Sequence, residues 1–224
     1  MSDRDLPNLR CVLCDRVTAE HFYRDDTRAD HMRDYYQCTH CSLVLISPEQ
    51  HLPADEEFKR YEMHENSPDD PDYRTFLNRM FRPMNERIEP GSYGLDFGSG
   101  PGPALHVMFE EAGHSVELFD LYYANDPSVF DKQYDFITST ETVEHLREPR
   151  KELDRLWACL KAGGWLGIMT KRVSSREAFR SWHYKNDDTH IIFFSADTFK
   201  WMGKRWGTTP EFEGDDVVLF NKPA

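Results

Sequence analysis

The sequence predicts an α/β fold with a small cysteine-rich module in front of it, and three observations carry this prediction. A strand, a glycine-rich turn and a helix follow one another between Tyr93 and Gly113. Three more strand-like segments lie at 115–120, 134–140 and 165–170, with a helical pattern between the last two. Two C-x-x-C pairs come before this region. With 224 residues, the chain has room for one full α/β domain and a small appendage.

The two C-x-x-C pairs have the spacing of a zinc site. Cys11-Val-Leu-Cys14 and Cys38-Thr-His-Cys41 are separated by 23 residues, and four thiolates can hold Zn²⁺ in a tetrahedron with Zn–S bonds of about 2.3 Å. A reducing cytosol disfavours disulfides, and a redox motif would need a βαβ context that is missing here. We therefore expect Cys11, Cys14, Cys38 and Cys41 to hold structural Zn²⁺. The fifth cysteine, Cys159, lies in a helical apolar pattern and is expected to be a buried, inert thiol.

Residues 1–50 are predicted to form this zinc ribbon, with short strands at 21–24, 35–37 and 42–48. A polar, proline-rich stretch follows, and we interpret residues 51–90 as a linker with lid helices.

Two helices are expected in this linker. The first is short and covers 55–63, and the second is amphipathic and covers 72–88, where Pro83 marks a bend or a break. The stretch from Tyr61 to Asn66 gathers several polar groups. It fits either a solvated helix end or a lid over a ligand.

The glycine-rich turn is the feature around which the α/β region is organised. Its sequence is Leu95-Asp-Phe-Gly-Ser-Gly-Pro-Gly, and glycines let the backbone approach a ligand closely at a helix N-terminus. The dinucleotide fingerprint would require glycine where Pro103 stands, and the Gly-Lys-Ser/Thr of a P-loop is absent. By itself, this turn leaves open a nicotinamide enzyme or a purely structural role.

Further elements follow this turn in order. The strand at 115–120 ends in Asp120, and a carboxylate there can accept hydrogen bonds from both hydroxyls of a ribose. After the strand at 134–140 we expect a helix at 149–160, a glycine turn at Gly163-Gly164 and a strand to residue 170. A helix at 196–205 and a hairpin of strands 209–213 and 216–220 are predicted to close the chain.

The ordered motifs resemble the class I S-adenosylmethionine-dependent methyltransferases. They are Leu95-Asp-Phe-Gly-Ser-Gly, Tyr134-Asp-Phe-Ile-Thr, Glu141-Thr-Val-Glu-His-Leu, Leu160-Lys-Ala-Gly-Gly and Thr189-His-Ile-Ile-Phe-Phe-Ser. This resemblance implies a Rossmann-like sheet with a closing antiparallel hairpin over residues 91–224, bound to S-adenosyl-L-methionine. A zinc ribbon before such a domain is similar to sugar C-methyltransferases and some rRNA guanine methyltransferases.

The resemblance also implies which residues bind the cofactor. They are Asp96, Gly98, Ser99, Gly100, Gly102, Asp120, Leu121, Thr140, Glu141 and His145.

The chain departs from the family at 121–133, because these 13 residues leave no room for the usual extra helix and strand with its adenine-contacting acid. Tyr122-Tyr123, Asp126 and Asp131 remain candidates for that contact.

The methyl donor of this family is already activated, so the protein mainly positions the reactants, and a general base is needed only if the acceptor must lose a proton. The candidate catalytic residues are His190, His64 and Tyr61, in an acceptor wall that also includes His183 and Tyr184. For His190 a catalytic role and a structural role both stay open.

Charge restricts the partner. The net charge of −13 and pI near 5.2 disfavour nucleic acid and anionic membranes, because both are bound through Lys and Arg. No apolar run approaches the length of about 20 residues that spans a bilayer, and the N-terminus lacks the apolar core of a signal peptide, so we expect a cytoplasmic protein.

We therefore expect a methyltransferase that acts on a small molecule. The alternatives are an RNA methyltransferase that uses the zinc ribbon for recognition, and a non-catalytic binding module. The oligomeric state stays open.

Overall fold

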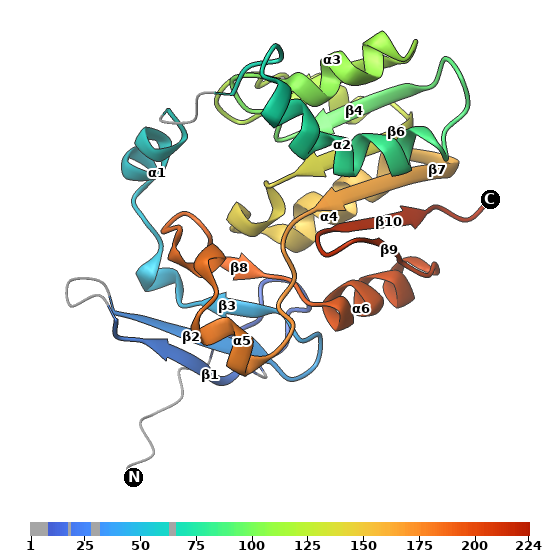
Figure 1. The fold of residues 1–224 in the computed structure, drawn as a ribbon. Coiled ribbons are helices and arrows are strands. Elements are labelled where there is room, and N and C mark those ends of the chain that lie inside the picture. The colour runs from blue at the N-terminus through green and yellow to red at the C-terminus, as the bar shows by residue number, and fades with distance from the viewer. Residues whose placement is uncertain (1–8, 18, 28–31, 63–65) are drawn as a thin grey trace.

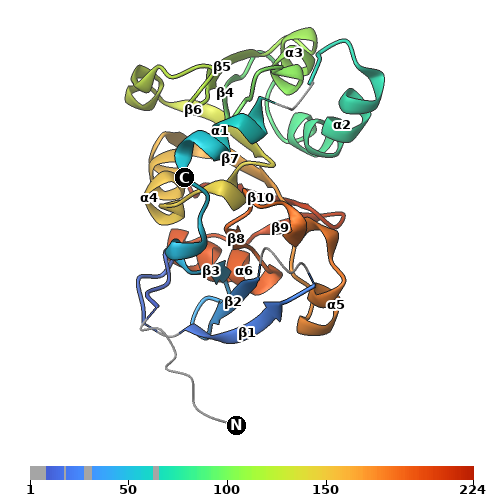
Figure 2. The same cartoon turned by 90° about the vertical axis from the view of Figure 1, so that its left-hand side faces the viewer.

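The computed structural model describes residues 9–17, 19–27, 32–62 and 66–224. It contains two sheets, one above the other in Figures 1 and 2. The larger sheet has the strand order β5-β4-β6-β7-β10-β9. Its strands are β4 (Tyr93–Phe97), β5 (Ser115–Phe119), β6 (Tyr134–Thr140), β7 (Leu160–Met169), β9 (Glu211–Glu213) and β10 (Val217–Asn221).

The larger sheet is parallel from β5 to β7, and the β9–β10 hairpin closes it in antiparallel orientation. The predicted parallel sheet with a closing hairpin is therefore confirmed. Strand β5 lies at the edge, because the segment at 121–133 contains a 3₁₀ helix, η2 (Pro127–Asp131), and no strand that extends the sheet.

Helices cover both faces of this sheet. One face carries α2 (Pro71–Asn85) and α3 (Ala104–Glu111), and the other carries α4 (Pro149–Ala158) and α6 (Ala196–Trp206). Alternate residues of β10 show the division, since Val217 and Leu219 join the core under α2 and α3, while Val218 and Phe220 join the core on the opposite face. The result is a three-layer α/β/α arrangement.

The smaller sheet has the order β1-β2-β3-β8. Its strands are β1 (Ala19–Asp25), β2 (Arg33–Cys38), β3 (Val44–Ile46) and β8 (Ile192–Phe193), and α5 (Arg176–Arg180) packs against β1. Strand β8 comes from the C-terminal half of the chain. It pairs with β3 through Val44 with Phe193 and Leu45 with Ile192.

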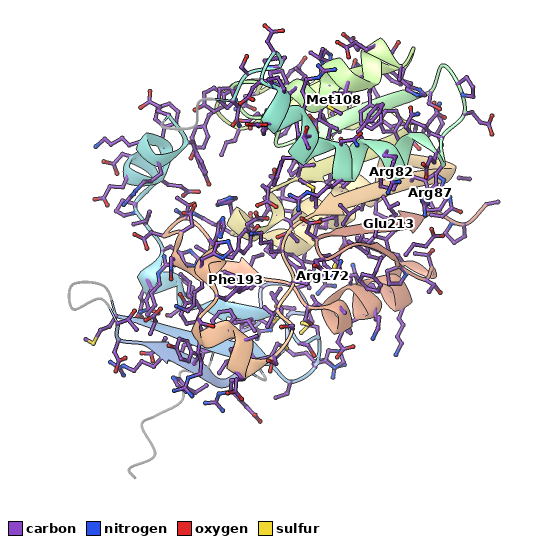
Figure 3. The ribbon with its side chains drawn as sticks, in the orientation of Figure 1. Arg82, Arg87, Met108, Arg172, Phe193 and Glu213 are labelled. Carbon is purple, nitrogen blue, oxygen red and sulfur yellow. The ribbon has the colours of Figure 1, made fainter. Side chains whose placement is uncertain are left out.

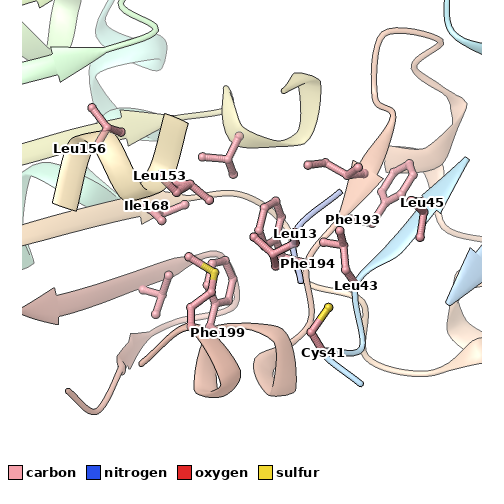
Figure 4. Close-up of a cluster of buried hydrophobic side chains, with 14 of the residues drawn as sticks. Leu13, Cys41, Leu43, Leu45, Leu153, Leu156, Ile168, Phe193, Phe194 and Phe199 are labelled. Atoms are coloured by element: carbon pink, nitrogen blue, oxygen red, sulfur yellow. The ribbon is translucent and has the colours of Figure 1, made fainter. Parts of the chain in front are cut away.

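The N-terminal module and the α/β region share one hydrophobic core. Figure 4 shows Leu13 and Leu43 of the N-terminal module near Phe193 and Phe194, with Leu153 of α4 on the other side. All five side chains are at most 2% exposed. The division of the chain into domains 1–50, 51–90 and 91–224 stays a prediction. The apolar residues of the N-terminal module are buried in part by residues after 190, such as Phe193 and Phe194.

The linker contains α1 (Ala54–Tyr61), which stands to the left of the larger sheet in Figure 1 and in front of it in Figure 2. Pro83 sits inside the last turns of α2. Just beyond α2, Arg87 bonds the closing hairpin through Glu213 Oε1 at 2.7 Å and Glu211 Oε2 at 3.1 Å (Figure 3). Of the helices described, none has the length and apolar character that crossing a membrane requires.

The prediction of a glycine turn at Gly163-Gly164 is wrong. Strand β7 begins at Leu160 and runs through both glycines, which lie in an irregularity where the register with β6 shifts. Gly163 has φ of 79°, so the chain bulges locally without leaving the sheet.

Candidate active site

A cavity of about 540 Å³ opens at the carboxyl ends of β4, β5 and β6. Strand β4 lies between β5 and β6, so the strand order reverses at this point. Open α/β sheets bind ligands outside the carboxyl ends of their strands at such a reversal. The volume falls within the usual range of small-molecule sites.

The glycine turn after β4 forms one wall of this cavity. Gly98 and Gly100 have φ of 78° and 64°, which side chains rarely adopt. A Cβ on Gly98 would lie 2.2 Å from Thr142 Oγ1, so the turn packs directly against the loop after β6. Gly102 does not line the cavity. A Cβ added at this position would lie 2.1 Å from the carbonyl oxygen of Asn66, so this glycine lets the backbone of the linker approach closely.

Asp120 fixes the loops on both sides of the cavity. Its Oδ2 accepts a hydrogen bond from the amide of Gly100 at 2.9 Å. Its Oδ1 accepts from the amides of Tyr122 at 2.9 Å and Tyr123 at 3.2 Å. Carboxylate oxygens have further lone pairs, so Asp120 keeps capacity for the hydroxyls of a bound ligand.

Two acids lie at the strand ends, of which Asp96 is buried and Glu141 is half-buried. Asp96 is 2% exposed, and burial raises the pKa of its carboxyl to about 7 although Thr138 Oγ1 donates to it at 2.9 Å. Glu141 follows β6 with φ of 47°, a strained conformation for a side chain other than glycine. Burial and the neighbouring Glu144 raise the pKa of Glu141 to about 8.

Aromatic side chains close the cavity near α1. Tyr122 packs against Phe58 and Tyr61, with ring centroids 4.9 and 5.7 Å apart. Tyr122 and Tyr123 both line the cavity, whereas Asp126 instead caps η2 by accepting from the amide of Ser128. The lid role of residues 61–66 stays a prediction.

His190 lies beside His145, with ring centroids 4.7 Å apart, and His145 in turn packs against Tyr61. The Nδ1 of His190 lies 2.7 Å from the carbonyl oxygen of Tyr184, so Nδ1 must donate and Nε2 keeps its lone pair. Burial, with the neighbouring His145, lowers the pKa of His190 to about 4, and the ring is neutral at pH 7. His145 is oriented in the same way, with Nδ1 3.0 Å from the carbonyl oxygen of Thr189.

A residue for which the sequence suggested no role lies behind this wall. Glu144 is fully buried, and the hydroxyl of Tyr184 donates to its Oε1. Its Oε2 has no hydrogen-bond partner among the described residues. Burial raises the pKa of Glu144 to about 7, although the hydrogen bond from the Tyr184 hydroxyl acts in the opposite direction. The only sequence signal was its place in Glu141-Thr-Val-Glu144, after a strand.

The cavity brings most of the predicted site residues together. Those that line it are Asp96, Gly98, Ser99, Gly100, Asp120, Leu121, Thr140, Glu141 and His145, together with Tyr61, His183, Tyr184 and His190. Gly102 lies outside the lining, and His64 lies outside the described residues.

The four predicted zinc ligands also meet. Cys11 Sγ lies 3.5 Å from Cys41 Sγ, and Cys14 Sγ lies 3.5 Å from Cys38 Sγ. All four sulfur atoms are within 4.8 Å of one another. A tetrahedral zinc with Zn–S bonds of about 2.3 Å needs sulfur atoms about 3.8 Å apart. The cluster therefore has the size of a zinc site, and no disulfide is present in it.

Residues 64–210 match a family model described as a methyltransferase domain. Among solved structures, the chain is similar to Burkholderia thailandensis 1,6-didemethyltoxoflavin-N1-methyltransferase with bound 1,6-didemethyltoxoflavin and S-adenosylhomocysteine. The identity is 15%, the match covers 92% of this chain and 100% of that one, and the TM-score is 0.53.

Two other solved structures are less similar. A SAM-dependent methyltransferase from Aquifex aeolicus shares 16% identity over 76% of this chain and 97% of that one, with a TM-score of 0.47. The second is a complex of the Haloferax volcanii Trm112 methyltransferase activator with a methyltransferase. The identity is 11%, the match covers 69% of this chain and 95% of that one, and the TM-score is 0.47. No curated protein matches the sequence.

Proposed function

The chain belongs to the methyltransferase-domain family, as its motifs predicted, and from this premise we propose that it transfers a methyl group from S-adenosyl-L-methionine to a small molecule. The observation that carries the proposal is that one cavity is lined both by the glycine turn with Asp120 and by the wall of Tyr61, Tyr184 and His190.

The cofactor half is the side formed by the ends of β4 and β5. Asp96 and the turn at 98–100 are suited to the methionine part, and Asp120 to the ribose hydroxyls. Tyr122 and Tyr123 replace the missing adenine-contacting acid with ring faces. When bound, S-adenosylmethionine supplies an activated methyl group, so the protein's own task is orientation.

The acceptor half is the side of His190, Tyr184 and Tyr61. His190 Nε2 can accept a hydrogen bond from an N–H or O–H of the acceptor, because its Nδ1 is already used. Burial and the nearby Glu57 raise the pKa of Tyr61 well above its ordinary value, so Tyr61 contributes a neutral hydroxyl and a ring face.

A small acceptor is favoured over RNA. No lysine or arginine is among the described residues that line the cavity, so nothing there neutralises phosphates. The toxoflavin enzyme with a similar fold holds a small molecule beside S-adenosylhomocysteine, according to its description. We also propose that the four cysteines hold a structural Zn²⁺ that fixes the N-terminal sheet.

Two measurements test the proposed function. Calorimetric titration should give micromolar binding of S-adenosylmethionine and S-adenosylhomocysteine. Methyl-labelled cofactor should then transfer label to the small-molecule fraction of a cell extract and not to total RNA. Absence of cofactor binding would leave a non-catalytic module, and label in RNA would establish the alternative substrate.

Asp120→Ala should weaken S-adenosylhomocysteine binding by about 10–100-fold, because one charged acceptor is lost and the loops it holds are loosened. The matched control is Asp126→Ala, which removes a carboxylate of the same segment that caps η2 outside the cavity. Equal affinities of both variants and the wild type, measured by calorimetry, would exclude Asp120 from the cofactor site.

His190→Ala should lower turnover about 100-fold while changing cofactor affinity less than about 3-fold, since His190 faces the acceptor half. His114→Ala is the control for deleting a buried imidazole, because His114 is 8% exposed, His190 is 6% exposed, and His114 lies outside the cavity. A His190→Ala protein that loses turnover, cofactor affinity and melting temperature together would show a structural role.

A further inference from the structure

The cavity carries an unusual set of charges for its size. Five acids are among the described residues that line it, and no lysine or arginine is. The acids are Glu57, Asp96, Asp120, Glu141 and Asp187. Two of the lining histidines, His145 and His190, have pKa values lowered by burial and supply no compensating charge at neutral pH. Burial raises the pKa of Asp96 to about 7 and that of Glu141 to about 8, so these two acids are ionised only in part at neutral pH. Even so, the lining holds acids and no lysine or arginine, and the cavity favours a cation.

Three of these acids already have other uses. Asp96 and Asp120 belong to the proposed cofactor half, and Glu57 forms an ion pair with Arg147 at 2.8 Å. Glu141 and Asp187 remain, and neither has an ion pair with lysine or arginine in the described residues. Glu141 was expected at the cofactor, but its carboxyl acts electrostatically on Tyr184 of the acceptor half, so we place it on the acceptor side.

Asp187 is held as a carboxylate. Burial pushes its pKa up, but Thr189 donates to Oδ1 through both its amide, at 2.9 Å, and its hydroxyl, and the pKa stays below its ordinary value. His190 Nε2 lies 3.8 Å from Asp187 Oδ2. A negative group therefore stands beside the histidine that faces the acceptor.

Glu141 is the second acceptor-side acid, and its Oε1 is buried without a hydrogen-bond partner among the described residues. Behind it lies the fully buried Glu144, whose Oε2 is also without a partner there. A buried carboxyl oxygen without a hydrogen-bond donor is costly, in Glu141 as in Glu144, unless a donor or a cation reaches it.

Aromatic rings complete this environment. Tyr61, Tyr73 and Tyr184 line the same cavity, and ring faces attract ammonium groups. We propose that the methyl acceptor is a small amine, which enters as its ammonium ion and is bound by Glu141 and Asp187 against these rings. This inference rests on the proposed methyltransferase function and names the substrate class of the same site.

The reaction balances without any further reactant. A primary ammonium R–NH₃⁺ gives one proton to the Glu141 carboxylate and becomes R–NH₂. The nitrogen lone pair forms the N–C bond to the sulfonium methyl while the C–S bond breaks and its electron pair stays on sulfur. The product is R–NH₂–CH₃⁺, and Glu141 returns its proton to solvent.

Glu141 is suited to take this proton, because its pKa of about 8 is closer to that of an amine than the pKa of an ordinary carboxyl. The titratable groups that act on it are Glu144, Tyr184, Asp216, Lys171 and Tyr73. Lys171 forms a hydrogen bond with His183, since the lysine Nζ lies 2.9 Å from the histidine Nε2.

The first test is calorimetry on the full chain saturated with S-adenosylhomocysteine, using benzylamine, benzyl alcohol and benzoate as probes. Benzylamine should bind at least 10-fold more tightly than benzyl alcohol, and benzoate should bind most weakly. Glu141→Gln, which keeps the shape of the side chain, should remove the preference for the amine. Glu177→Gln changes an exposed acid on α5 outside the cavity and should leave the preference intact.

A second measurement needs no variant. Since the pKa of Glu141 is about 8, most of this carboxyl is protonated at pH 7.5, and binding of an ammonium ion to the carboxylate should release protons. The apparent enthalpy for benzylamine should then differ between two buffers of different ionisation enthalpy, whereas that for benzyl alcohol should not.

The outcomes separate the two proposals. If S-adenosylhomocysteine does not bind, the methyltransferase proposal fails and the amine proposal fails with it. If S-adenosylhomocysteine binds but benzylamine shows no advantage over benzyl alcohol, or keeps its advantage in Glu141→Gln, the amine proposal alone is overturned.

Discussion

Cys38→Ser should remove the bound zinc and lower the melting temperature by ~10–20 °C, because loss of a structural metal costs on the order of 5 kcal/mol. Elemental analysis of the wild-type protein should give one zinc per chain, and the variant should give much less than one. Thermal unfolding followed by circular dichroism measures the second effect.

The size of this effect follows from the shared core. Strand β3 begins three residues after Cys41 and pairs with β8, which directly follows His190 and Ile191. The amide of Ile46 also donates to the carbonyl oxygen of Ile191 at 3.1 Å. Loss of the metal should therefore disturb the position of His190 in the acceptor wall, and turnover should fall together with the melting temperature.

The matched control is Cys159→Ser, since Cys159 is 3% exposed but lies outside the metal cluster. Its Sγ donates a weak hydrogen bond to the carbonyl oxygen of Phe130 at 3.4 Å. This variant should keep its zinc. A Cys38→Ser protein with unchanged metal content and melting temperature would refute a structural zinc at this cluster.

Gly98→Val should abolish cofactor binding, with an affinity loss of more than about 100-fold. The added Cβ would lie 2.2 Å from Thr142 Oγ1 and 2.3 Å from Thr142 Cγ2, so the turn and the loop after β6 must move apart. Valine also resists the φ of 78°, and strain with overpacking should cost roughly 2–5 kcal/mol of folding stability. Calorimetry with S-adenosylhomocysteine and thermal unfolding measure the two effects.

Gly113→Val separates backbone strain from the loss of the site. Gly113 has φ of 90°, and a Cβ there would meet nothing within 4 Å. It lies past the end of α3 and does not line the cavity. This control should lose stability and keep its cofactor affinity. If Gly98→Val binds S-adenosylhomocysteine as Gly113→Val does, the glycine turn is not the cofactor loop.

Local patterns were sufficient for much of the fold. Most strands and helices from Tyr93 onward and the closing hairpin could be predicted, because each depends on a periodic apolar pattern or on a turn, whereas the short α5 and β8 were not predicted. The grouping of four cysteines could be predicted from their spacing. In each case neighbouring residues in the sequence carry the signal.

The acceptor side could be predicted only in part. Tyr61, Tyr184 and His190 were expected to form a wall, and they line one cavity. The part played by Glu144 was missed, because its contact with Tyr184 joins residues 40 positions apart and a single acid within a motif has no periodicity. Gly102 was expected at the ligand, yet it admits the backbone of Asn66, which only the path of the linker decides.

The sequence by itself determined the glycine turn and the metal-type cysteine cluster, since these depend on short-range dihedral preferences and on residue spacing. The large sheet followed from the resemblance to the class I methyltransferases, and its strand order is read from the structure. Only the tertiary structure decided that the two-residue strand β8 pairs with β3, nearly 150 residues earlier. Such a short strand has no pattern of its own, and its place follows from the core that surrounds Phe193 and Phe194. That pairing sets the position of His190 and with it the acceptor half of the cavity.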